Sequence, residues 1–166
     1  MVRNIFAVAD DYVTPQSPKY PLAQKIQQEI VAPGMRGLKI VSWNVNSLRA
    51  GIVDPEKATC KSKFRPPQPE SPMGLLMSEV DPDIICLQET KLSPQHTECF
   101  EIPGYHQFWS CSTVKKGYSG VSIWSKMEPI QVTNTLEGLD ERVATEGRVL
   151  TAYYDNFVLV TVYVPN

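Results

Sequence analysis

The sequence lacks long apolar segments. None of its runs approaches the roughly 20 apolar residues that a membrane-spanning helix needs. The first 30 residues also lack the apolar core of a secretory signal. We therefore expect an intracellular protein with no membrane contact.

Residues that commonly bind soft metals are few. The four cysteines are Cys60, Cys86, Cys99 and Cys111. They show none of the close pair spacings of zinc sites, so we expect free thiols in a reducing compartment. His96 and His106 lie far apart in the sequence, without a helical pair spacing, and are expected at the surface or partly buried.

A strong charge of either sign is also missing. The net charge is -2 over 166 residues, which provides no general attraction for nucleic acid or anionic lipid. A polyanionic partner would have to be held by a local patch. The balance of 42% hydrophobic and 20% charged residues is that of one ordinary globular domain.

The pattern along the chain predicts an extension, a domain and an insertion. Residues 1–37 read as a poorly ordered extension with a short helix, in which Leu22, Ile26 and Ile30 share one face. Residues 38–166 form the domain. Within it, the proline-rich stretch 54–73 reads as an exposed insertion, which a surface loop or an error in the gene model would explain equally well.

The domain itself is dominated by predicted strands. One short helix is expected over residues 74–80. Seven β-branched or aromatic runs are expected as strands, over residues 38–45, 83–87, 104–110, 120–125, 129–135, 148–154 and 157–164. The turn at Asp155 and Asn156 makes the last two strands a hairpin. Seven strands with little helix leave sheet faces uncovered, so we expect a fragment or a truncated gene model.

Polar side chains follow several of these strands. Asn44 ends the first strand, Glu89 follows the second, and Tyr163 and Asn166 lie at the last. Because the ends of neighbouring strands meet at one edge of a sheet, we expect a carboxylate, two amides and a phenol to converge there.

Five motifs in this order resemble those of one enzyme family. They are SWNVNSLRAGI, DIICLQETK, GYSGVSIWSK, EGRVL and VTVYVPN. The chain from residue 38 to 166 is similar to the exonuclease III and apurinic/apyrimidinic endonuclease family, within the endonuclease/exonuclease/phosphatase superfamily. The resemblance implies an α/β fold, a four-layered sandwich of two packed β-sheets flanked by helices, present here as its incomplete first half.

The resemblance also implies an activity. The expected protein is a DNA repair hydrolase that uses a Mg²⁺-activated water, with Mn²⁺ as a substitute, to cut the phosphodiester 5′ to an abasic site. A 3′ exonuclease or phosphodiesterase activity is a further expectation. The implied partner is double-stranded DNA with abasic sites, and the full-length enzyme is expected to be a monomer in the nucleus, with mitochondria as the alternative.

Particular residues inherit roles from the resemblance. Glu89 of LQET is the implied metal ligand, and Asn44 of SWN touches the metal cluster and orients a catalytic aspartate. Tyr163 and Asn166 of YVPN contact the scissile phosphate. Asn46 stands where relatives carry Asp or Asn, which argues against a second metal.

Basic and aromatic residues are implied in DNA contact. Lys115, Lys116 and Tyr118 occupy a DNA-contacting loop, and Arg49 and Lys91 add phosphate contacts. Simpler interpretations remain open: a solvated turn for the two loop lysines, a packed ring for Tyr118, a turn former for Asn44 and a surface ion pair for Glu89.

The chain also departs from the family pattern. The GDxN and SDH motifs, which supply groups around the attacking water, are absent from these residues. We therefore expect the 166-residue chain alone to be inactive. Two alternatives stay open: a retroelement-type endonuclease or other phosphoesterase of the superfamily, and a non-catalytic DNA-binding fragment.

Overall fold

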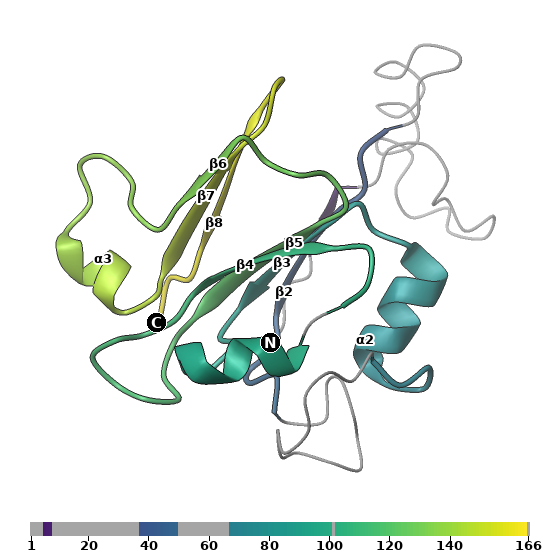
Figure 1. Cartoon of the computed structure of the whole chain (residues 1–166), viewed down its shortest axis with the longest axis horizontal. Helices are drawn as coiled ribbons and strands as arrows, with labels where there is room; N and C mark the ends of the chain where they lie inside the picture. The colour runs from purple at the N-terminus through teal and green to yellow at the C-terminus, as the bar shows by residue number, and fades with distance from the viewer. Residues whose placement is uncertain (1–4, 8–36, 50–66, 101, 166) are drawn as a thin grey trace.

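Two β-sheets pack face to face in this protein. The computed structural model describes residues 5–7, 37–49, 67–100 and 102–165. One sheet has the strand order β1-β2-β3-β5-β4 and the other has the order β6-β7-β8. Figure 1 shows the helix α2 on the side of the first sheet that faces away from the second. This arrangement confirms the predicted α/β sandwich of two packed sheets.

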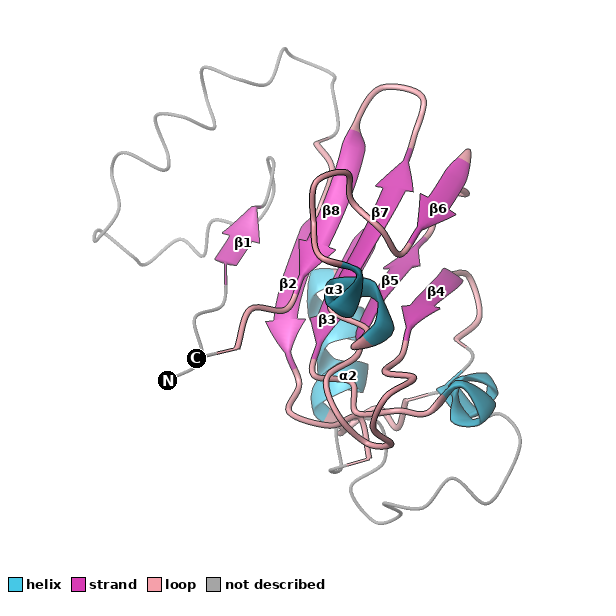
Figure 2. Ribbon diagram, turned by 90° about the vertical axis from the view of Figure 1, so that its left-hand side faces the viewer, coloured by secondary structure: helices cyan, strands magenta, loops and turns pink. Residues whose placement is uncertain are grey.

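The five-stranded sheet is organised around a parallel pair. Its strands are β1 (Ile5–Ala7), β2 (Ile40–Asn44), β3 (Ile84–Gln88), β4 (His106–Ser110) and β5 (Val121–Ser125). β2 and β3 run parallel, with Asn44 opposite Gln88, and β5 is antiparallel to β3. The C-terminal ends of β2 and β3 therefore lie at the same edge, as Figure 2 shows.

The central strand β3 is buried on both faces, which explains its uninterrupted apolar sequence. Ile85 and Leu87 pack toward the helices, in a cluster with Trp124. Ile84 and Cys86 pack toward the second sheet, with Leu150 and other apolar residues. Burial raises the pKa of the Cys86 thiol to about 12, and Cys86 is free, as predicted.

The three-stranded sheet completes the inner core. Its strands are β6 (Gln131–Thr133), β7 (Val149–Tyr153) and β8 (Val158–Val162), all antiparallel to their neighbours. The predicted hairpin of β7 and β8 is confirmed. Gln88 joins the two sheets, because its Nε2 donates to Thr161 Oγ1 at 3.0 Å and to Ser42 Oγ at 3.1 Å.

Short helices flank the two sheets, and α2 lies on the outer face of the first sheet (Figure 1). The helices are α2 (Pro72–Leu75), the π-helical turn η1 (Leu76–Val80), the 3-10 helix η2 (Pro94–Phe100) and α3 (Glu141–Thr145). α2 and η1 together form the predicted helix over residues 74–80. The helix begins at Ser71, whose Oγ accepts a hydrogen bond from the Gly74 backbone N–H at 3.0 Å.

The end of the proline-rich stretch is packed, which corrects the prediction that residues 54–73 are exposed throughout. Ser71 and Met73 are fully buried. A Cβ on Gly74 would lie 2.0 Å from the Gln68 carbonyl oxygen, so the turn before the helix presses directly on its first residues. The earlier part of the stretch, residues 54–66, lies outside the described residues.

The extension contributes a strand that the sequence pattern did not predict. β1 pairs antiparallel with β2, with Ile5 opposite Ser42 and Ala7 opposite Ile40. Three residues are too few to show a strand period, so only pairing with β2 defines this element. The predicted short helix around residues 22–30 lies outside the described residues.

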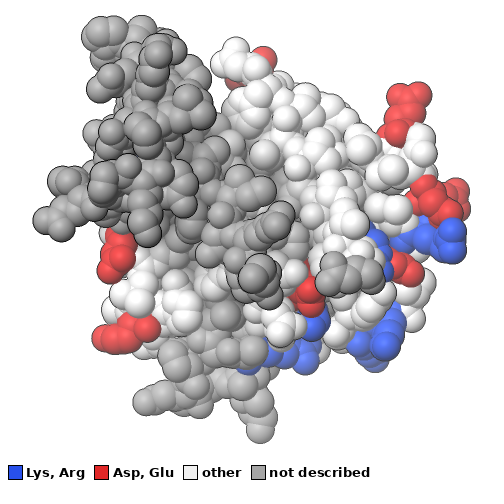
Figure 3. Space-filling model, turned by 180° about the vertical axis from the view of Figure 1, so that it is seen from behind, with Lys and Arg blue, Asp and Glu red and all other residues white. Residues whose placement is uncertain are grey.

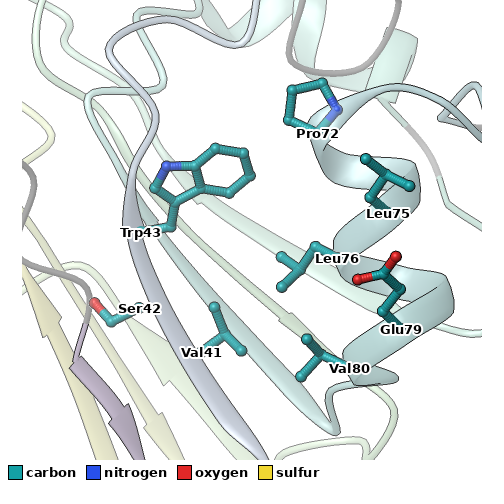
Figure 4. A pocket seen from close by; sticks show the side chains of 8 residues that line it. All are labelled: Val41, Ser42, Trp43, Pro72, Leu75, Leu76, Glu79 and Val80. Carbon is teal, nitrogen blue, oxygen red and sulfur yellow. The ribbon is translucent and has the colours of Figure 1, made fainter.

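A hollow separates β2 from the helix that covers it. It measures about 270 Å³ and is lined mainly by apolar side chains, among them Val41, Trp43 and Leu76 (Figure 4). Trp43 is consequently half-buried, whereas the sequence predicted a strand buried on both faces.

None of the helices among the described residues has the length and apolarity to cross a membrane.

Candidate active site

Three of the predicted site residues meet at one edge of the sheets. Asn44 ends β2, Glu89 follows β3 and Tyr163 follows β8. The Asn44 side-chain amide donates to Glu89 Oε1 at 2.8 Å, and the Tyr163 hydroxyl lies close enough to the Glu89 carboxylate to help lower its pKa. Asn166, the fourth predicted residue, lies outside the described residues.

The backbone around Glu89 adopts an uncommon conformation. Glu89 and Lys91 have φ angles of 53° and 52°, in the left-handed region that non-glycine residues rarely occupy. Hydrogen bonds hold this segment on both sides. Ser47 N donates to Glu89 O at 2.7 Å, and Lys91 N donates to Ser119 O at 2.9 Å. Such strain persists only where surrounding contacts impose it, and it is concentrated at functional sites.

The GYSGV motif supplies part of that support. Thr90 N donates to Gly120 O at 3.0 Å. A Cβ on Gly120 would lie 2.3 Å from Thr90 Oγ1, and the φ of Gly120 is 92°. Glycine is therefore required at this position for the loop to approach the segment that carries Glu89.

The carboxylate of Glu89 is held in its charged form. The hydrogen bond from Asn44 lowers the pKa of Glu89 below its ordinary value, and Lys91 lowers it further, against the opposing effect of burial. Burial and the neighbouring Glu89 carboxylate raise the pKa of Tyr163, so its hydroxyl stays protonated and able to donate a hydrogen bond.

Lys91 lies beside the carboxylate. Its Nζ is 3.0 Å from Glu89 Oε2 and 2.6 Å from Asn46 Oδ1. A surface ion pair was the simpler interpretation of Glu89, and Glu89 does form an ion pair, with Lys91. This ion pair is part of the same cluster of polar side chains at the strand ends.

Arg148 is a residue of this site that the sequence reasoning missed. Its guanidinium lies 5.1 Å from the ring centre of Tyr163 and 5.4 Å from that of Tyr118. It also donates to the Tyr118 hydroxyl at 2.6 Å and pairs with Glu146. The EGR motif contains both Glu146 and Arg148, so the signal was present in the sequence, but no role was assigned to it.

The predicted DNA-contacting loop lies next to this group. Lys115 and Lys116 are exposed, whereas Tyr118 is half-buried against Arg148. The Lys115 ammonium lies 5.3 Å from the Tyr118 ring centre. The loop reaches Lys91, because a Cβ on Gly117 would lie 3.9 Å from the Lys91 carbonyl oxygen.

Arg49, the remaining predicted phosphate contact, pairs with a histidine. Its Nη2 lies 3.1 Å from His96 Nδ1.

On the face shown in Figure 3, Lys and Arg side chains gather along one edge among a few carboxylates, and much of the other described surface is uncharged. On this face the described basic side chains are therefore local.

The side chains at the strand ends offer the ligand chemistry of a hard cation. Glu89 presents a carboxylate, and Asn44 and Asn46 present amide oxygens, which are oxygen ligands that Mg²⁺ accepts. Asn44 Oδ1 accepts from the Asn46 backbone N–H at 3.1 Å, so the amide of Asn44 bridges the turn and Glu89. Within the described part of the chain, no group of three His, Cys, Asp or Glu side chains converges. Glu89 is the carboxylate that accompanies the two amides.

Comparison with known proteins identifies the family. Residues 41–165 match the model of the Endonuclease/Exonuclease/phosphatase family. The exodeoxyribonuclease of Bacillus subtilis is 40% identical over 129 residues, which cover 78% of this chain and 43% of that protein. The DNA repair nuclease APEX1 of Danio rerio is 39% identical over 132 residues, covering 78% of this chain and 36% of that protein.

A solved structure shows the same arrangement. The AP endonuclease from Archaeoglobus fulgidus superposes with a TM-score of 0.51 at 29% identity, over 78% of this chain and 42% of that one. The chain spans about two-fifths of the length of these relatives. The resemblance to the exonuclease III and apurinic/apyrimidinic endonuclease branch is thereby confirmed, and the chain belongs to the Endonuclease/Exonuclease/phosphatase family.

Proposed function

We propose that this chain is the N-terminal part of a DNA repair nuclease that hydrolyses the phosphodiester 5′ to an abasic site. One observation carries the proposal: Asn44, Glu89 and Tyr163 converge from three separate strands, next to an exposed basic loop. The relatives named above are DNA nucleases, and one of them is an AP endonuclease. Removal of 3′-terminal groups from DNA is proposed as a second activity of the same site.

The family is metal-dependent in general. We propose Mg²⁺ as the ion of this protein, with Mn²⁺ as a substitute, because the oxygen donors of Glu89, Asn44 and Asn46 suit hard cations. Such an ion would supply charge neutralisation and an activated water. Glu89 would hold it, and Asn44 would orient the Glu89 carboxylate through the 2.8 Å hydrogen bond.

The remaining residues would bind and orient the substrate. When DNA is bound, the protonated Tyr163 hydroxyl would direct its one donor hydrogen to an oxygen of the scissile phosphate, where charge increases in the transition state. Arg148 stacks on the Tyr163 ring and restricts its position. Lys115, Lys116 and Arg49 would bind neighbouring phosphates. We propose that a single copy of the protein binds the double-stranded DNA.

The experiment that tests the proposal uses a chimera. Residues 38–166 replace the matching segment of the Bacillus subtilis exodeoxyribonuclease, and incision of a duplex with one abasic site is measured in Mg²⁺. The chimera should cut the abasic strand, and the same chimera with Glu89→Gln should lose at least a hundredfold in rate. Glu137→Gln, on an exposed loop, is the matched control and should leave the rate unchanged.

Two results would contradict the proposal. One is a folded chimera, shown by an unchanged circular dichroism spectrum, that does not incise the abasic duplex. The other is incision that survives Glu89→Gln. DNA binding by the 166-residue chain that depends on salt and is indifferent to Mg²⁺ would instead favour the non-catalytic alternative.

A further inference from the structure

Lys91 occupies the space between the oxygens of the candidate metal site. Its ammonium contacts Asn46 Oδ1 at 2.6 Å and Glu89 Oε2 at 3.0 Å. The other carboxylate oxygen of Glu89 accepts from Asn44 Nδ2 at 2.8 Å. Both oxygens of Glu89 are therefore engaged, one by a neutral amide and the other by a cation.

The backbone explains why Lys91 reaches this position. Glu89 and Lys91 are two residues apart, and both have φ angles near 50°. Their backbone groups are held by Ser47, on the turn after β2, and by Ser119, on the loop before β5. The start of the Lys91 side chain is thus fixed, while its ammonium ends a flexible stem and the side chain is 32% exposed.

A divalent cation would need the same oxygens that the ammonium contacts. An ammonium within about 3 Å of a carboxylate oxygen and a divalent ion bound to that carboxylate would repel each other strongly. The ammonium can leave without a change in the backbone. A DNA phosphate would be its destination, because Lys91 borders the exposed loop whose Lys115 and Lys116 are proposed to bind phosphates.

We infer that Lys91 is a movable counter-ion that couples cation binding to DNA binding. In the cation-free site it pairs with Glu89 and Asn46. When a divalent cation binds Glu89, Lys91 swings out and pairs with a DNA phosphate. This inference rests on the proposed function, since it concerns the same site, and it predicts that each ligand tightens the binding of the other.

The first experiment measures Mn²⁺ binding to the 166-residue chain without DNA, from the electron paramagnetic resonance signal of free Mn²⁺. Lys91→Met removes the competing ammonium and should tighten Mn²⁺ binding about threefold to fivefold, the size typical of a partly exposed ion pair. Lys91→Arg retains a competing cation and should bind Mn²⁺ no more tightly than the wild type. Glu89→Gln should weaken binding at least tenfold.

The matched control is Lys126→Met. Lys126 also pairs with a carboxylate, that of Asp81, but at the opposite end of β3. The Lys126→Met substitution removes the same charge from the protein as Lys91→Met does. Mn²⁺ affinity should be unchanged in this variant, which separates a contact at the site from a general effect of net charge.

The second experiment measures the coupling. Fluorescence anisotropy gives the affinity for a labelled duplex that carries one abasic-site analogue, with and without Mn²⁺. For each protein, the affinity for DNA with Mn²⁺ is divided by the affinity without it. Mn²⁺ should tighten DNA binding more in the wild type than in Lys91→Met, so this ratio should be about threefold to fivefold larger in the wild type.

Distinct outcomes would overturn the inference or the proposed function. If Lys91→Met binds Mn²⁺ no more tightly than the wild type while Glu89→Gln still weakens binding, the counter-ion inference is wrong and the proposed metal site stands. Equal tightening by Lys126→Met would also overturn the inference. Mn²⁺ binding that is indifferent to Glu89→Gln would overturn both.

Discussion

The side-chain amide of Asn44 donates a 2.8 Å hydrogen bond to Glu89 Oε1 and so joins the ends of two parallel strands. The two residues are 45 positions apart in the chain. This contact orients the carboxylate of the candidate metal site. Its strength and its consequences can be measured directly.

Removal of the Asn44 amide should change the acidity of Glu89. The hydrogen bond favours the charged carboxylate, so Asn44→Ala should raise the pKa of Glu89 toward its ordinary value. The measurement is a carbon-13 NMR titration of the Glu89 carboxyl in the metal-free chain. Asn134→Ala, an exposed loop residue, is the control. An unchanged pKa in Asn44→Ala would show that the hydrogen bond does not form in solution.

The lowered pKa of Glu89 predicts a pH dependence of stability. A carboxyl group whose pKa is lower in the folded state stabilises the fold above its unfolded value of 4.5, and this contribution is lost as the pH falls through the folded value. In EDTA, Glu89→Gln should therefore reduce the free energy of unfolding at pH 7, by about 1 kcal/mol or less for this partly exposed group. The difference between the two proteins should shrink below pH 4.5. Urea unfolding at several pH values tests this, and a difference that is constant with pH would contradict it.

Two glycines, one of them in the EGR motif, allow the cost of a close backbone contact to be measured. Gly138 and Gly147 both have positive φ angles, 83° and 68°. A Cβ on Gly138 meets nothing within 4 Å, whereas a Cβ on Gly147 would lie 2.6 Å from the Cys111 carbonyl carbon. Gly138→Ala should cost about 1–2 kcal/mol of unfolding free energy through its backbone conformation alone.

Gly147→Ala should cost a further 1–3 kcal/mol or so, because the backbone of residues 110–112 would have to move. The same movement would shift Arg148, the next residue, away from Tyr118 and Tyr163. Urea unfolding of both variants measures the costs. Similar values for Gly138→Ala and Gly147→Ala would show that the close approach to Cys111 does not constrain the fold.

The exposed loop lysines should contribute to DNA affinity through charge alone. Replacement of Lys115 and Lys116 by Ala should weaken duplex binding at low salt and reduce the slope of log K against log[salt] by about two. Lys126→Ala, at the other end of the sheet, should leave the slope unchanged. Anisotropy titrations from 50 to 200 mM salt, roughly the range over which this term is large, test this. An unchanged slope for the double variant would favour the interpretation of a simply solvated turn.

Much of the fold was predictable from local patterns. β3 and β5 are buried on both faces, so their apolar runs identify them without knowledge of their partners. The β7–β8 hairpin follows from two β-branched runs around the turn at Asp155 and Asn156. All seven predicted strands form, most of them shorter than predicted by one or two residues at one end or both. Strand ends are set by tertiary contacts as well as by composition.

Other elements were not predictable for physical reasons. β1 has three residues and exists through its pairing with β2. The packing of Ser71 and Met73 depends on the turn at Gln68, although the composition of that stretch suggests exposure. In both cases long-range or steric contacts outweigh the local preference of the chain.

The candidate site divides in the same way. The sequence by itself determined the chemistry that is present: a carboxylate at Glu89, amides at Asn44 and Asn46, a phenol at Tyr163 and lysines on a glycine-containing loop. Only the tertiary structure decided that Lys91 contacts Glu89 and Asn46, and that Arg148 lies over the rings of both Tyr118 and Tyr163. The sequence specifies the types of side chain. The distances between them arise only when parallel strands, a sheet-to-sheet interface and a strained turn place residues from distant positions within a few ångströms of one another.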